Sequence, residues 1–186
     1  MQTTTFNKPR IKVAGEPAIR VKALLTGLQD VLAQYKCILF LDFDGVLHGF
    51  GKGHAGLLQY TYRIERILRD NPEVCIVIST SWRFNQTMET MVGYFAPDVR
   101  HRFVGVTPEV QEKWPPYVKH ERFKECQKFM EDNSYDGGWI AIDDSKSLFP
   151  DNHENVYITE GNIGMTDEDE MELEAHLKSA IGKANL

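Results

Sequence analysis

Several features that would point to a class of function are missing from this 186-residue chain. No apolar run approaches the roughly 20 residues that a membrane-spanning helix needs, so we do not expect a membrane protein. The first twenty residues, MQTTTFNKPRIKVAGEPAIR, lack the apolar core of a secretory signal. Cysteines are few, and Cys37, Cys75 and Cys126 show no CxxC spacing. An odd number of cysteines without an export signal favours reduced thiols and a cytoplasmic location.

An excess of positive charge is also missing. The net charge of −6 argues against strong non-specific binding to nucleic acid. The charge is unevenly spread, however: residues 100–128 hold seven Lys/Arg and four Asp/Glu, whereas residues 131–174 hold one Lys and fourteen Asp/Glu. Such runs indicate either a solvated surface or, for the basic segment, a contribution to binding an anionic substrate.

The length fits one domain with a substantial core, and 42% apolar and 26% charged residues are an ordinary globular balance. No internal repeat or low-complexity tract interrupts the chain. Residues 18–35 have apolar residues at helical spacing. We therefore expect an N-terminal arm and amphipathic helix over residues 1–36, and a catalytic domain over residues 37–186.

After residue 36, short apolar segments alternate with amphipathic ones. The predicted strands are 37–43, 74–80, 102–106, 137–145 and, as a possible fifth, 155–160; the predicted helices are 57–70, 84–95, 120–132 and 167–181. This alternation predicts an α/β fold, a Rossmann-like parallel sheet flanked by helices on both faces. In open sheets of this kind, the active crevice lies beyond the carboxyl ends of the strands.

Polar side chains follow three of these strands. They are Asp42 and Asp44 after the first strand, Ser79, Thr80 and Ser81 after the second, and Asp143 and Asp144 after the fourth. Four carboxylates in one crevice would repel one another and be driven to protonate. A hard divalent cation relieves this repulsion, and Mg²⁺ prefers carboxylate, carbonyl and water oxygens. The strand ends therefore predict a Mg²⁺ site.

The same crevice would suit a phosphoryl group. Hydroxyls and a basic residue such as Lys119 or Arg122 supply the hydrogen-bond donors and positive charge that phosphate oxygens need. One carboxylate can attack phosphorus, and a second can donate a proton to the leaving group and later take one from water.

With these residues the sequence resembles the haloacid dehalogenase (HAD) superfamily of phosphatases. LDFDGVL matches the family's first motif, VIST the second and AIDDS the acidic fourth, in the family's order. STSWR, GVTP, Arg122-x-x-Glu125, IDDSKSLFP and ITEGNIGMT look like a compact subgroup from bacteria and phages, some of whose members are associated with nucleic-acid repair proteins. The likeness covers roughly residues 37–180.

The resemblance implies a role for each matching residue. Asp42 would be the nucleophile, and Asp44 the general acid/base with its backbone carbonyl on the metal. Thr80 would bind the transferring phosphoryl group, although Ser79 and Ser81 leave the register open by one position. The third motif needs a Lys or Arg, for which Lys119 is the first choice and Arg122 the second. The predicted Mg²⁺ ligands are Asp42, Asp44, Asp144 and Asp143, with Asp144 favoured over Asp143 for direct contact.

Further residues are candidates for substrate binding, each with an ordinary alternative. Ser81, Arg83, His48 and Arg122 are the substrate-binding candidates. Arg83 is equally explained by a salt bridge and His48 by a surface position, and Trp82 suits core packing better than a substrate platform. The arginines of residues 60–69 and the acids that open the last helix are expected to be a solvated face and a favourable first turn.

These observations predict a Mg²⁺-dependent phosphomonoesterase that acts through an aspartyl-phosphate. Asp44 favours phosphoryl transfer over dehalogenation, because a halide leaving group needs no proton. The intervals from Asp42 to Thr80 and from Thr80 to Asp144 leave no room for a full cap domain, so the site should be open. The favoured substrate is a nucleotide or nucleic-acid terminal phosphate; alternatives are a phosphoprotein or small metabolite, or a non-catalytic regulatory or binding protein on this fold. A receiver domain is disfavoured, because its paired acids precede its Lys, whereas Asp143 and Asp144 follow Lys119.

Overall fold

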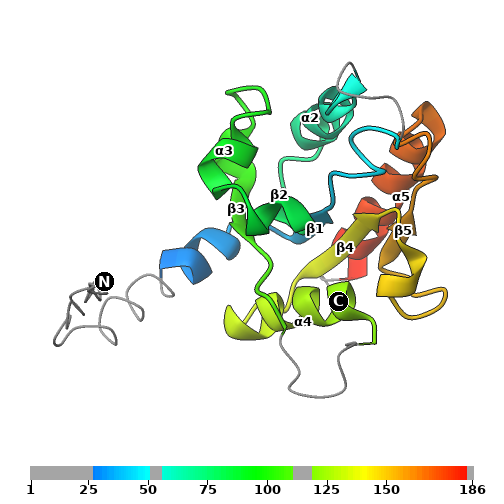
Figure 1. Ribbon diagram of the computed structural model, residues 1–186. Coiled ribbons are helices and arrows are strands. Elements are labelled where there is room, and N and C mark those ends of the chain that lie inside the picture. Colours follow the sequence, from blue (N-terminus) through cyan, green and yellow to red (C-terminus); the bar gives the residue numbers. More distant parts are fainter. Residues whose placement is uncertain (1–26, 51–55, 111–118, 184–186) are drawn as a thin grey trace, which may run out of the picture.

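Apolar runs too short and too continuous for amphipathic helices become the central strands of this chain. The computed structural model describes residues 27–50, 56–110 and 119–183. Residues 27–32 are helical and precede the sheet. The remaining elements, with η for a 3-10 helix, are β1 (Cys37–Leu41), α2 (Thr61–Asp70), β2 (Val74–Ile78), η2 (Ser81–Phe84), α3 (Met88–Val92), η3 (Arg100–Arg102), β3 (Phe103–Val106), α4 (Glu121–Asp132), β4 (Gly138–Asp143), η4 (Lys146–Leu148), β5 (Val156–Ile158) and α5 (Asp167–Lys183) (Figure 1).

The five strands form one parallel sheet in the order β3-β2-β1-β4-β5. Every residue of β1 and β2 is buried, which explains why both strands are apolar without alternation. Leu39 and Leu41 face a core completed by α2, α3 and α5. Ile38 and Phe40 face the opposite core, which α4 and residues 27–32 complete. The predicted Rossmann-like parallel sheet, covered on both faces, is confirmed.

Two predicted helices differ from the structure. The segment expected as one helix over 84–95 contains η2, which ends at Phe84, and the short α3. Thr87 separates the two, because its hydroxyl accepts the Thr90 amide at the N-cap of α3, whereas η2 begins earlier, at its own N-cap Thr80, whose hydroxyl accepts the Trp82 amide. Of the helix expected over 18–35, residues 18–26 lie outside the described residues.

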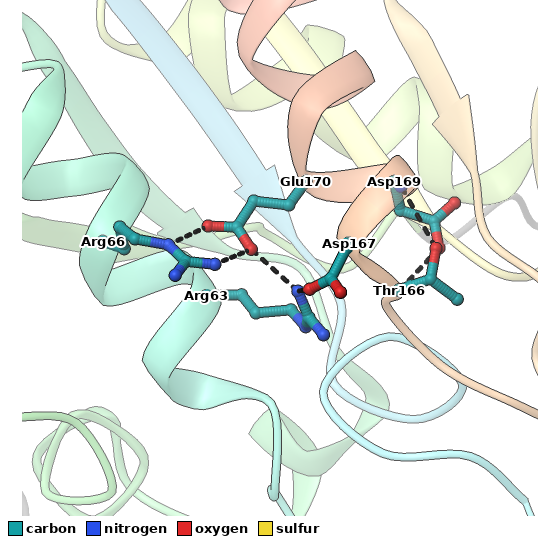
Figure 2. Close-up of polar contacts among 6 residues, drawn as sticks. All are labelled: Arg63, Arg66, Thr166, Asp167, Asp169 and Glu170. Atoms are coloured by element: carbon teal, nitrogen blue, oxygen red, sulfur yellow. Dashed lines mark hydrogen bonds and ion pairs between the residues drawn. The ribbon is translucent and has the colours of Figure 1, made fainter.

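Ion pairs join α2 to α5, where the sequence suggested only a solvated face. Figure 2 shows Glu170 of α5 between Arg63 and Arg66 of α2. Arg63 donates to Glu170 at 2.8 Å and also to Asp167, and the side chains of Arg63 and Glu170 are 8% and 6% exposed. Burial alone would raise the pKa of Glu170, but hydrogen bonds from Arg66 and Arg63 lower it below its ordinary value. These pairs fix one cover helix against the other.

The connections between strands are short in the described part of the chain. Among the described residues, α2 is the α-helix between β1 and β2, and α4 is the α-helix between β3 and β4, and these residues form no substantial cap domain. Among the described helices, none has both the length and the apolar character required to cross a membrane.

Candidate active site

The carboxylates predicted to meet at the carboxyl ends of the strands do meet. Strands β1 and β4 pair in parallel with Leu41 opposite Ile142, so Asp42 follows one strand beside Asp143 at the end of the other. Asp42, Asp143 and Asp144 each offer a carboxylate oxygen within 4.8 Å of the others. Asp42 and Asp143 are buried, and Asp144 is half-buried. The sheet itself therefore builds a compact acidic cluster.

Two glycines permit the close approach of Asp144. Gly45 has a φ of +69°, and a Cβ added there would lie 2.5 Å from Cγ of Asp144. A Cβ at Gly161 would lie 2.4 Å from Oδ2 of the same carboxylate. The Gly45 carbonyl also accepts a hydrogen bond from the Thr159 hydroxyl at 2.9 Å. Side chains at either glycine would displace Asp144 from the cluster.

Crowding of these acids changes their protonation. Burial raises the pKa of Asp42 to about 6, against the opposing effects of Arg122 and of hydrogen bonds from the Phe43 amide and the Thr80 hydroxyl. Burial and the neighbouring Asp42 raise the pKa of Asp143 to about 8. Burial also raises the pKa of Asp144. The positive charge near these three carboxylates is therefore too small to keep their pKa values at the ordinary level.

The hydroxyl groups of the three residues after β2 lie in different surroundings. Thr80 is fully buried and its hydroxyl donates to Asp42. The Ser79 hydroxyl instead lies 4.0 Å from the Cys126 sulfur on α4, and Ser81 is exposed. The structure therefore brings Thr80, rather than Ser79, to the predicted nucleophile.

Of the two candidate cations for the third motif, Arg122 faces the acids. Its Nε lies 3.9 Å from Oδ2 of Asp143, and its side chain is 11% exposed. Its Nη1 is buried without a hydrogen-bond partner among the described residues. Lys119 precedes α4 and is exposed. Arg122 shares the buried face of α4 with Glu125, three residues on.

Arg83 forms a buried pair rather than lying free in the crevice. It donates through Nη1 to the Thr80 carbonyl at 2.8 Å and through Nη2 to the carboxylate of Glu125. The side chains of Arg83 and Glu125 are 6% and 2% exposed. Burial lowers the pKa of Arg83 and raises that of Glu125. Through these two contacts, Arg83 connects Glu125 of α4 to the backbone of Thr80.

Two ring nitrogens contact the carboxylate of Asp44. Nε1 of Trp82 donates to its Oδ2 at 2.8 Å, and Nε2 of His48 lies 3.2 Å from its Oδ1. The indole also packs edge-on against Phe43, with ring centroids 5.5 Å apart. His48 is 9% exposed, so it is not the surface histidine of the ordinary alternative. The contact of His48 is with Asp44.

The cluster fits a divalent cation on its own chemistry. Three carboxylates converge, and Oδ2 of Asp143 is buried without a hydrogen-bond partner among the described residues. Oδ1 of the same residue accepts the Ser145 amide at 2.8 Å. An oxygen-rich site with one unsatisfied buried carboxylate oxygen suits Mg²⁺. The Asp44 carboxylate is not one of the three grouped acids.

Sequence reasoning missed two contacts of this site. Trp82 was expected to serve in packing, and its hydrogen bond to Asp44 was not foreseen, although it directly follows the second motif. Glu125 was noted only within an Arg-x-x-Glu pattern, yet it is the buried partner of Arg83. A buried acid on the apolar face of a helix was the available signal for Glu125.

Comparison with known proteins agrees with this geometry. No curated protein and no solved structure matches the chain. The family model described as the HAD domain in Swiss Army Knife RNA repair proteins matches residues 38–170, which span β1 to the start of α5. The match covers well over half of the chain, and the parallel sheet fits this fold; the chain therefore belongs to the family of HAD domains in Swiss Army Knife RNA repair proteins.

Proposed function

We propose that this protein is a Mg²⁺-dependent phosphomonoesterase of the HAD type that forms an aspartyl-phosphate on Asp42. One observation carries the proposal: a buried carboxylate at the end of the central strand is grouped with two further acids and accepts a hydrogen bond from Thr80. An aspartate in such a setting is a nucleophile rather than a structural cap, because no helix begins at Asp42 for it to cap.

The reaction follows from the two aspartates after β1. A carboxylate oxygen of Asp42 attacks phosphorus, the bond from phosphorus to the ester oxygen breaks, and Asp44 gives its proton to that leaving oxygen. Water then attacks phosphorus while Asp44 takes its proton, and the bond from phosphorus to Asp42 breaks. Inorganic phosphate leaves and both aspartates return to their starting states. Trp82 and His48 keep the Asp44 carboxylate oriented for both transfers.

Positive charge in the crevice comes from a cation and from Arg122. Asp42, Asp143 and Asp144 would hold Mg²⁺, which supplies charge neutralisation and polarises phosphoryl oxygens when bound. Arg122 lowers the pKa of Asp42 against the effect of burial, so it favours the ionised nucleophile. We assign Arg122 to the third motif, and the exposed Lys119 stays the alternative.

The favoured substrate is a nucleotide or a nucleic-acid terminal phosphate. The family's description names RNA repair proteins, and the described residues of the connections form no cap domain over the crevice. Phosphoproteins and small metabolites remain alternative substrates, and a non-catalytic binding role is the alternative to catalysis. The three free, buried cysteines suit a reducing cytoplasm, where we propose that the protein works.

Release of phosphate from a chromogenic aryl phosphate tests the proposal. Wild-type protein should be active with Mg²⁺ and inactive with a chelator, and Asp42→Asn should abolish turnover. Asp151→Asn, at an exposed aspartate after η4, is the matched control and should keep wild-type activity. Activity that survives in Asp42→Asn would refute the assignment of Asp42 as the nucleophile. A wild type that is inactive on a broad phosphomonoester panel would favour the alternative of a non-catalytic binding protein.

A further inference from the structure

A small cavity lies on the Arg122 side of the acidic cluster. Its volume is about 160 Å³, and Ser81, Phe84, Arg122 and Leu148 are among the residues that line it. Since Nε of Arg122 also lies 3.9 Å from Oδ2 of Asp143, Arg122 borders both the cavity and the acidic cluster. Typical sites for drug-sized ligands begin at roughly 300 Å³. The cavity is thus sized for one ring group attached to a phosphate bound at the acids.

An exposed aromatic ring forms one side of this cavity. Phe84 is 57% exposed, although it lies at the end of η2, directly beside the predicted site. The guanidinium carbon of Arg83 lies 4.4 Å from the centroid of the Phe84 ring. Arg83 is itself fixed by the Thr80 carbonyl and by Glu125. A buried cation therefore holds the ring in position while more than half of its surface stays free.

The charges around the cavity balance. Arg83 and Arg122 face Glu121 and Glu125, two cations against two anions in the lining. Glu125 already accepts a hydrogen bond from Arg83 and lies 3.8 Å from Nε of Arg122. The cavity is therefore a poor trap for a second phosphate. Phe84 is the exposed aromatic side chain of its lining, and its ring suits an uncharged flat group.

We propose that Phe84 is a stacking platform for the nucleobase of a nucleotide substrate, with the base in this cavity and the phosphate at the acidic cluster. The inference rests on the proposed phosphatase function and extends it to the part of the substrate that leaves. Stacking on an aromatic side chain tolerates every base, because each has a π-face. The platform thus selects nucleotides over base-free esters without selecting a base sequence.

The test compares substrates with and without a base. For Phe84→Ala, KM for adenosine monophosphate (the 3′ or 5′ ester, whichever wild type hydrolyses faster) should rise roughly 5- to 150-fold relative to KM for glycerol phosphate. This range is the fold-change for about 1–3 kcal/mol of base stacking at about 1.4 kcal/mol per tenfold. Phe84→Trp should restore the preference, since the indole keeps an aromatic face.

Phe50→Ala is the matched control. Phe50 is 51% exposed, but it lies against the Gly161 backbone and is not among the residues that line the cavity. It should not change the ratio of the two KM values. An equal change in the two KM values in Phe84→Ala would refute the role of Phe84 as a stacking platform. A selective rise in KM for adenosine monophosphate in Phe50→Ala instead would also refute it.

A binding experiment distinguishes failure of this inference from failure of the proposed function. Calorimetry with adenosine monophosphate and Mg²⁺ on the Asp42→Asn background should give a Kd that rises by a similar factor when Phe84→Ala is added. If wild type is inert on all esters but this Kd still rises, the proposed catalysis fails and the subsite stands. If wild type is active and neither KM nor Kd responds selectively to Phe84→Ala, the subsite fails and the catalysis stands.

Discussion

Replacement of Trp82 by phenylalanine isolates the hydrogen bond that orients Asp44. The indole Nε1 donates to Oδ2 of Asp44 at 2.8 Å, while His48 lies 3.2 Å from Oδ1. Phenylalanine keeps an aromatic ring against Phe43 but has no donor. A hydrogen bond to a charged group contributes about 1.5–3 kcal/mol, which corresponds to roughly 10- to 150-fold. Because His48 remains as a second partner, we expect the lower end, about tenfold.

The assay uses leaving groups of different basicity. An alkoxide needs the proton of Asp44 as it leaves, whereas a nitrophenolate departs without it. The ratio kcat/KM reports the steps up to formation of the aspartyl-phosphate. Trp82→Phe should therefore lower kcat/KM by about tenfold for an alkyl phosphate and by much less for nitrophenyl phosphate.

A purely structural role for Trp82 would give a different result. General loosening of the site would lower kcat/KM equally for both esters. Tyr94→Phe is the control, because the Tyr94 ring packs against Trp82 and its hydroxyl contacts only Gln86 among the described residues. It should leave both values close to wild type. An equal loss for the two esters in Trp82→Phe, or no loss at all, would refute the positioning of Asp44 by the indole.

Four other measurements test the charges and thiols of this fold. Glu170→Ala should lower the free energy of unfolding by about 3 kcal/mol in urea titrations, since it leaves the buried Arg63 with only the exposed Asp167 as an ionic partner. Asp167→Ala should cost clearly less, and equal losses in the two variants would contradict this reasoning. Burial raises the pKa of Asp42 to about 6 and of Asp143 to about 8, so the metal-free protein should lose stability as pH rises from the unfolded value of 3.8 through these pKa values. Mg²⁺ binds the ionised carboxylates, so it should raise Tm more near pH 8 than near pH 5, and equal shifts would count against the site. The three buried cysteines should react with a thiol reagent only on unfolding, and fast labelling of native protein would contradict their burial.

The sheet could be predicted because burial on both faces leaves a direct mark on the sequence. Residues 37–41 and 74–78 are apolar without alternation, and both became fully buried strands. Their carboxyl ends then fix where Asp42 and Thr80 lie relative to each other. The helix expected over 84–95 was wrong in its bounds, because the N-cap at Thr87 restarts the chain as a separate short helix.

Which of Lys119 and Arg122 faces the acids could not be predicted in the same way, because it depends on which residues of α4 lie on its buried face. Lys119 precedes the helix, whereas Arg122 falls three residues before the buried Glu125 and so shares its face. The contacts of Asp44 were equally hidden, since they depend on how the loop after β1 and η2 fold over each other. Sequence spacing predicts strand ends well and says little about side chains that meet across loops.

Charge runs of opposite sign illustrate the same limit. The arginines of α2 and the acids that open α5 each look like a solvated face when taken alone. Together they pair the buried Glu170 with the buried Arg63 and the exposed Arg66, more than a hundred residues away in sequence (Figure 2). A long-range pair leaves no periodic signal, so only the folded arrangement of the two helices reveals it.

The electrostatics of the crevice explain why a cation belongs to the proposed reaction. Asp42, Asp143 and Asp144 are grouped around one point, and Nε of Arg122 lies 3.9 Å from Oδ2 of Asp143. The raised pKa values of Asp42 and Asp143 show that this arrangement favours protonation, and a protonated Asp42 cannot attack phosphorus. A divalent cation at the acids would lower those pKa values and reduce the repulsion of an incoming phosphate at the same time. Nucleophile activation and substrate binding therefore depend on the same charge.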